Sequence, residues 1–250
     1  MKTLAYYKCR AAYIGVGFAL ASAAWAQVRS IDSVLIMPRV YNDIPGATGA
    51  FVNRFPGFIS FTEAGVSQTS GGFADRDVGY FSNDGGASPY PFRNNDYFSA
   101  SFSVTVSATA DSPRKEAGFL LSDVNHTFPG GDLQFIVDSD GHEVVQFGGF
   151  SFYAFAPDYV SPYFTGTTIR LGIKYFRTRD GNNAFQFSAS GISSPVFELP
   201  PGVGIGDGSP LGGYFQIVND PNNPGNAGTA VFRGIQIVSI GGDDQGDDAQ

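Results

Sequence analysis

The sequence predicts an all-β protein, an antiparallel β-sandwich or jelly roll. The chain is rich in Gly (33 residues), Phe (24) and Tyr (12), and aromatic residues favour strands while Gly, Asn and Asp favour the turns between them. No segment shows a helical apolar period with capping residues. Instead, roughly ten short apolar segments recur at nearly regular spacing, which is typical of a sandwich and not of a βαβ fold.

Two hairpins are the clearest local features. Leu133–Val137 leads into the turn Asp-Ser-Asp-Gly, and Glu143–Phe147 runs back from it. Thr168–Phe176 and Ala184–Ala189 flank a second turn that also contains Asp-Gly. Because Gly accepts a positive φ angle, Asp-Gly between two strand-like segments predicts a tight antiparallel connection in both places.

Strict alternation of apolar and polar residues marks a further strand, Phe98–Ser107. Phe102, Val104 and Val106 share one face of it, and serine and threonine occupy the other. The remaining predicted strands are Ile31–Met37, Gly57–Phe61, Glu116–Leu121, Gly212–Val218 and Ala230–Ile240.

The first 26 residues have the organisation of a secretory signal peptide. A positively charged segment precedes the short apolar run 11–21, and Ala24 and Ala26 supply small residues where a signal peptidase cleaves. The apolar run is well short of the roughly 20 residues that span a bilayer. We therefore expect cleavage after Ala26 and a secreted, periplasmic or cell-surface protein that is not inserted in the membrane.

Composition sets the domain plan and excludes several chemistries. Residues 27–240 suit a single sandwich domain, and the acidic stretch 241–250 is expected to be a disordered tail. Cys9 is the only cysteine and leaves with the signal peptide, which excludes thiol catalysis and disulfides in the mature chain. The formal net charge of −8 makes nucleic acid an unexpected partner.

The order and character of the strands resemble the concanavalin A-like lectin and glucanase sandwiches, including laminin-G-like domains. FSASFSVTV is followed by KEAGFLL, by the two hairpins and by TAVFRGIQIVSI, over about Asn42–Ile240. The segment VYNDIPGAT is also similar to exported proteins of uncharacterised function in environmental bacteria. The resemblance implies a jelly roll with a glycan partner, but the glucanase motif E-x-D-x-x-E is missing, so no catalytic residue is assigned.

The candidate ligand site is the aromatic stretch 150–164, which two prolines interrupt. Tyr153, Tyr159 and Tyr163 would stack on sugar rings if they lie on an exposed loop, and Asp158 would accept hydrogen bonds from sugar hydroxyls. The alternative is that these rings pack over the end of the sandwich.

The candidate metal site is a loop rich in oxygen donors, suited to a structural calcium ion. Its proposed ligands are Asn219, Asp220, Asn222, Asn223 and Asn226. The alternative is an ordinary long turn. Asp138, Asp140 and Glu143 form a second oxygen-rich group, for which a simple solvated turn is the alternative.

No residue pattern identifies a catalytic centre. The chain contains neither a G-x-S-x-G nor an H-E-x-x-H motif, and His126 and His142 lie in turn-like sequence. Glu116 could point from a sheet face as a catalytic acid, but a salt-bridged strand residue is the ordinary interpretation of such a position.

We therefore expect an exported, non-enzymatic module that binds a polysaccharide or glycoconjugate. Two alternatives stay open. One is a structural cell-surface or matrix protein whose copies associate with one another. The other is a divergent glycan hydrolase or lyase, which would need two acids facing each other across a groove.

Overall fold

A computed structural model describes residues 31–66, 72–155, 162–219 and 226–240. The predicted signal peptide and acidic tail lie outside the described residues. Within these ranges the chain forms strands joined by turns and loops, and no described helix is long and apolar enough to cross a membrane.

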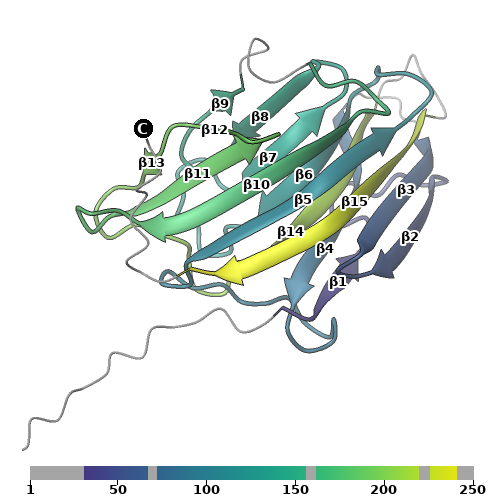
Figure 1. Cartoon of the computed structure of the whole chain (residues 1–250). Coiled ribbons are helices and arrows are strands. Elements are labelled where there is room, and N and C mark those ends of the chain that lie inside the picture. The colour runs from purple at the N-terminus through teal and green to yellow at the C-terminus, as the bar shows by residue number, and fades with distance from the viewer. Residues whose placement is uncertain (1–30, 67–71, 156–161, 220–225, 241–250) are drawn as a thin grey trace, which may run out of the picture.

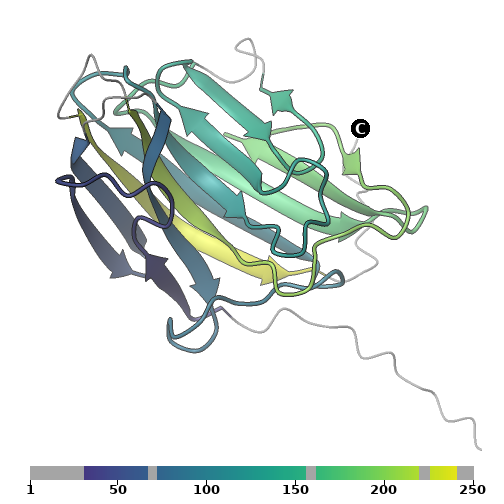
Figure 2. The same ribbon diagram turned by 180° about the vertical axis from the view of Figure 1, so that it is seen from behind.

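The strands form two antiparallel sheets packed face to face (Figures 1 and 2). Sheet A has the order β1 (Ser33–Met37), β4 (Gly72–Ser82), β14 (Leu211–Asn219), β6 (Lys115–Leu121), β7 (Leu133–Asp138), β8 (Glu143–Phe147) and β9 (Tyr153–Ala154). Sheet B has the order β12 (Ile192–Ser193), β11 (Asn183–Ala189), β10 (Thr168–Arg177), β5 (Phe98–Ser107), β15 (Asn226–Ser239), β3 (Phe58–Val66) and β2 (Thr48–Arg54), with β13 (Phe197–Glu198) also paired to β11. The predicted antiparallel β-sandwich is thus confirmed.

The strand predictions are confirmed where the pattern was strong. β5 and β8 have the predicted bounds, and both predicted hairpins form as β7–β8 and β10–β11. Two long strands, β2 and β4, were not predicted from the sequence. Every residue of β2 is exposed at the sheet edge. The strand therefore has no buried apolar face, and its sequence lacks the alternation of apolar and polar residues from which a strand is predicted. β4 carries buried carboxylates at Asp75 and Asp77, which break the alternation.

Stacked aromatic rings join the two sheets at the centre of the core. Phe102 of β5 in sheet B lies against Phe119 of β6 in sheet A, with ring centroids 4.0 Å apart. Phe232 of β15 meets the edge of Phe102 at 5.0 Å and lies 6.0 Å from Phe61 of β3. All four side chains are at most 1% exposed, so the apolar contact between the sheets is continuous across them.

A buried group of charges lies between β3 and β4. Arg39 donates from Nη2 to Oε2 of Glu63 at 2.8 Å, and its backbone N–H donates to Oδ1 of Asp77 at 3.1 Å. The backbone N–H of Ile44 donates to Oδ1 of Asp75 at 2.7 Å. Burial, followed by the nearby Glu63 carboxyl, raises the pKa of Asp77 to about 8. Asp77 therefore keeps its proton at neutral pH.

Replacing Phe102 with alanine tests the contact between the sheets. Because the ring is fully buried between them, we expect Phe102→Ala to lower the free energy of unfolding by about 3–5 kcal/mol. Urea denaturation measures this change. Phe152→Ala is the matched control, since that ring is 67% exposed and its loss should change stability by no more than about 0.5 kcal/mol. Equal effects of the two changes would contradict the assigned packing.

Replacing Asp77 with asparagine tests the raised pKa. The folded chain retains a proton that the unfolded chain loses above an ordinary pKa of 3.8, so this group's stabilisation is complete at low pH and is lost as the pH rises towards about 8. Asparagine resembles the protonated acid. We expect Asp77→Asn to unfold with a smaller pH dependence than the native chain between those values, and to be the more stable of the two at pH 8, as urea denaturation would measure. Asp180→Asn, in an exposed turn, should leave the native pH dependence intact.

Candidate functional site

Polar side chains form a row on the outer face of sheet A. Strand alternation places Ala117 and Phe215 towards the core and turns their neighbours outwards. The register puts Gln216 of β14 opposite Glu116 of β6, Glu116 opposite Asp138 of β7, and Asp138 opposite Glu143 of β8. Residues from four strands are thereby brought together although they are distant in sequence.

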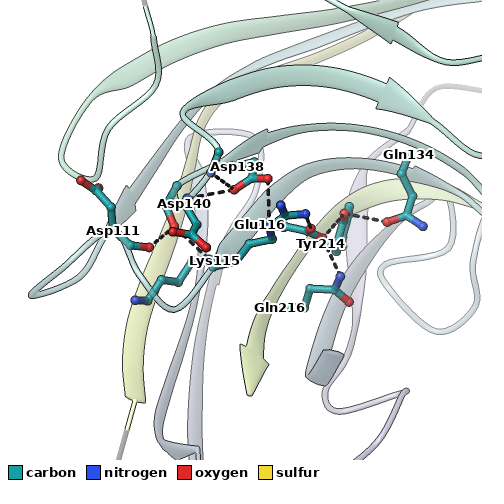
Figure 3. A network of polar contacts seen from close by, with 11 residues as sticks. Asp111, Lys115, Glu116, Gln134, Asp138, Asp140, Tyr214 and Gln216 are labelled. Atoms are coloured by element: carbon teal, nitrogen blue, oxygen red, sulfur yellow. Dashed lines mark hydrogen bonds and ion pairs between the residues drawn. The ribbon is translucent and has the colours of Figure 1, made fainter. Parts of the chain in front are cut away.

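Hydrogen bonds connect this row into one network (Figure 3). Arg76 of β4 donates from Nε to Oε1 of Gln216 at 2.7 Å. Gln216 donates from Nε2 to Oε2 of Glu116 at 2.6 Å. The Tyr214 hydroxyl donates to Oε1 of Gln134 at 2.7 Å and lies 3.4 Å from Oε2 of Glu116. The amide and carboxylate groups are therefore held in fixed orientations.

Arg114 closes the other end of the network. Its Nη1 lies 3.4 Å from Oε1 of Glu116 and its Nε lies 3.0 Å from Oδ2 of Asp138. The second oxygen of Asp138 accepts hydrogen bonds from the backbone N–H groups of Asp140 and Gly141. The Arg114 side chain is 39% exposed, while those of Glu116 and Asp138 are 1% and 2% exposed. The two buried carboxylates thus hold the Arg114 guanidinium in place while part of the Arg114 side chain remains exposed to solvent.

Burial governs the electrostatics of this face. It raises the pKa of Glu116, against the hydrogen bond from Gln216, which favours the ionised form. It also raises the pKa of Tyr214 well above its usual range, and the nearby Glu116 carboxyl adds to this effect. The Tyr214 hydroxyl therefore stays protonated and serves as a hydrogen-bond donor near neutral pH.

Aromatic and apolar side chains continue the same face. The Arg76 guanidinium lies 5.0 Å from the ring centroid of Tyr41 and 5.7 Å from that of Tyr214. Tyr41 is 52% exposed, so part of its ring faces solvent. A separate apolar cluster lies alongside, made of Val78, Tyr80, Leu120, Ile136, Val145 and Tyr214. The face therefore combines fixed polar groups with a ring surface.

Lys115 is drawn beside this network but belongs to the other side of the sheet (Figure 3). Adjacent residues of a strand point to opposite faces of the sheet. Glu116 and Arg114 face outwards, so Lys115 between them faces inwards. The Lys115 ammonium donates to the backbone oxygen of Ala110 at 2.9 Å, and burial lowers its pKa. Lys115 thus stabilises the preceding loop and does not contribute to the outer face.

The predicted ligand-binding tyrosines lie in different surroundings from those expected. Tyr163 is 1% exposed and its hydroxyl accepts the Val106 N–H at 2.7 Å, so the expectation of an exposed ring is wrong at this position. Tyr153 is half-buried against Phe155 and Phe197. Both rings pack against apolar side chains, which keeps nearly all of Tyr163 and part of Tyr153 out of solvent. Asp158 and Tyr159 lie outside the described residues, and a ligand role there stays a prediction.

The predicted calcium site also falls largely outside the described residues. Asp220, Asn222 and Asn223 lie there, while Asn219 ends β14 and Asn226 begins β15. In the described part of the chain, no three His, Cys, Asp or Glu side chains are grouped to hold a metal ion. Calcium binding by the 219–226 loop stays a prediction. At the second oxygen-rich group, Asp138 binds the backbone of its own turn.

Glu116 was a candidate from the sequence, whereas its hydrogen-bond partners in this network were not predicted. The structure supports the salt-bridged interpretation of Glu116, through Arg114. Tyr214 and Gln216 were missed, although their alternation with the buried Phe215 and Ile217 marked them as outward-facing. The pairing of β14 with both β6 and β4 could not be inferred, because it joins segments far apart in the chain.

No protein-family model matches the chain, and no curated protein matches it in sequence. Solved structures do match. A Bacteroides ovatus GH16 protein of a mixed-linkage glucan locus, solved with an oligosaccharide product, has a TM-score of 0.53 at 10% identity and covers 82% of this chain and 94% of its own.

Two further matches have lower TM-scores. Alginate lyase A1-II′ aligns with a TM-score of 0.47 at 12% identity, covering 76% of this chain and 83% of its own. The carbohydrate-binding module CBM66 from Bacillus subtilis aligns with a TM-score of 0.37 at 11% identity, covering 80% and 99%. At these identities the likeness concerns the fold alone. The two antiparallel sheets and the match to the GH16 structure show that this chain has the concanavalin A-like jelly-roll fold.

Proposed function

We propose that this protein is an exported, non-enzymatic module that binds a polysaccharide or glycoconjugate on the outer face of sheet A. The observation that carries the proposal is a pair of partly exposed guanidiniums, Arg76 and Arg114, which buried Gln216 and Glu116 hold in place beside the exposed ring of Tyr41. The glycan complex of the similarly folded GH16 protein makes a glycan a reasonable ligand class for such a sheet face.

The arrangement suits sugars for a physical reason. Sugar hydroxyls need hydrogen-bond partners in fixed directions, and each of the two guanidiniums supplies several donors in one plane. Here buried partners hold these groups before any ligand arrives, which reduces the entropy lost on binding. The exposed part of the Tyr41 ring offers a surface for the C–H face of a sugar.

Replacing Arg76 tests the proposal directly. Arg76→Ala removes a donor and the cation above two tyrosine rings, so we expect glycan affinity to fall about tenfold or more, equal to about 1.4 kcal/mol. The measurement is isothermal titration of the intact mature chain against neutral and acidic polysaccharides. Urea denaturation of the same variant confirms that it remains folded.

Arg93→Ala is the matched control, because Arg93 is exposed in the loop between β4 and β5, away from this row. It should leave the affinity unchanged. Equal binding by the Arg76→Ala and native chains would contradict the assignment of the ligand to sheet A. Absence of binding to every glycan in the panel would contradict the glycan proposal itself.

One observation favours a second candidate function, glycoside hydrolysis. Glu116 and Asp138 lie directly opposite each other on adjacent strands, and Arg114 contacts one carboxyl oxygen of each. Retaining glycosidases use two neighbouring carboxyl groups, one of them with a raised pKa as the proton donor. Burial raises the pKa of Glu116 in this sense.

Product analysis separates the two functions. Prolonged incubation with a bound polysaccharide should release no new reducing ends if the protein only binds. Release of reducing ends that Glu116→Gln abolishes would establish hydrolysis and overturn the non-enzymatic proposal. Asp180→Asn, in an exposed turn, is the control acid variant.

A further inference from the structure

The outer face of sheet B differs sharply in charge from the chain as a whole. The five adjacent strands β10, β5, β15, β3 and β2 contain one carboxylate among their residues, Glu63, and it is buried between the sheets. Their outward positions carry Arg54, Arg170, Lys174 and Arg233. A protein with a formal net charge of −8 thus presents a cationic face (Figure 1 views it from this side).

Three of these cations lie in a single row across the sheet. The register pairs Arg54 of β2 with Phe58 of β3, Phe58 with Arg233 of β15, Arg233 with Ser103 of β5, and Ser103 with Arg170 of β10. An arginine therefore occupies every second strand. Since neighbouring strands lie about 4.8 Å apart, successive guanidinium-bearing positions recur at roughly 10 Å.

Among the described residues, the groups that contact these three guanidiniums are all uncharged. Arg54 and Arg233 lie 5.4 and 5.3 Å from the ring centroid of Phe58. Arg170 donates from Nη2 to Oγ of Ser101 at 2.7 Å and to Oε1 of Gln236 at 2.9 Å. All three arginines are exposed. Their orientation is thus set while their charge is not neutralised by an acid, unlike that of Arg114 on sheet A.

Hydroxyl groups fill the positions around the row. The outward side of β5 presents Ser99, Ser101, Ser103 and Thr105, and Thr105 and Thr168 hydrogen-bond to each other at 2.6 Å. Thr62 and Thr229 form a similar pair at 2.9 Å. The outer face of sheet B therefore presents small hydroxyls around the row of arginines and the Phe58 ring.

We propose that the outer face of sheet B binds a linear anionic polysaccharide, through carboxylate or sulfate groups seated on Arg54, Arg233 and Arg170. Guanidinium binds such planar or tetrahedral oxyanions by paired hydrogen bonds. The roughly 10 Å interval between the backbone positions of these arginines is comparable to the length of a disaccharide. An extended chain charged once per disaccharide therefore brings one anion within reach of each arginine side chain. The serine and threonine hydroxyls face the uncharged sugar between them.

Charge favours this occupant over nucleic acid. A duplex carries closely spaced phosphates and binds through an extensive basic field, whereas this chain is acidic overall and the row on sheet B contains three arginines. The proposal goes beyond the glycan site on sheet A. It concerns the opposite face and different residues, so either site can be disproved without the other.

The experiment compares two double variants of the intact mature chain that change charge equally. Arg170→Gln/Arg233→Gln removes two cations of the row, and Arg93→Gln/Arg177→Gln removes two exposed cations outside it. The probes are hyaluronate, which carries one carboxylate per disaccharide, and heparin, with a neutral β-glucan for comparison, each titrated at two salt concentrations. We expect the native chain to bind an anionic probe with an affinity that falls with salt. We expect the row variant to lose about tenfold or more and the control variant to change little.

Three results would overturn the proposal. The first is equal loss in the two double variants, which would reflect net charge alone. The second is equal affinity for double-stranded DNA, which would exclude a polysaccharide as the specific partner. The third is loss of anionic-probe binding in Arg76→Ala with the sheet B row intact, which would assign the polyanion to sheet A. Unfolding curves of each variant verify that its fold is retained.

Discussion

The contact between the two sheets is the constraint on which the rest of this structure depends. Side chains of a strand point alternately to its two faces, so each residue committed to the core also commits its neighbours to solvent. Stacking of Phe102 on Phe119 at 4.0 Å sets which face of β5 and of β6 is inside. The chain has no cysteine after Cys9, so this apolar burial, not disulfides, holds the described domain together.

This division of side chains between core and solvent creates the outer faces of both sheets. Phe215 and Ala117 face the core, so Gln216 and Glu116 face outwards on neighbouring strands. On sheet A the resulting row mixes acids with cations, and buried Glu116 and Asp138 orient the Arg114 guanidinium while buried Gln216 orients that of Arg76. On sheet B the acid is turned inwards at Glu63, and the arginines remain unneutralised. The same alternation therefore yields two faces of different charge from one acidic chain.

The sequence was a sufficient guide wherever strand character is a local property. Phe98–Ser107 alternates without interruption and forms β5 with those bounds, and Asp-Gly at both predicted turns leads to hairpins. Local pattern failed where burial is decided elsewhere. β4 buries Asp77 because Arg39 and Glu63 meet it from other segments. Tyr163 is buried because Val106 supplies a partner for its hydroxyl in the core.

The sequence by itself therefore determined the fold class, the hairpins and the acidic character of the chain, because composition and alternation act over a few residues. Only the tertiary structure decided the functional surfaces. Glu116, Asp138 and Gln216 are neighbours solely through the order β14-β6-β7, and Arg54, Arg233 and Arg170 solely through the order β2-β3-β15-β5-β10. Strand order depends on pairing between distant segments, and no local pattern contains that information.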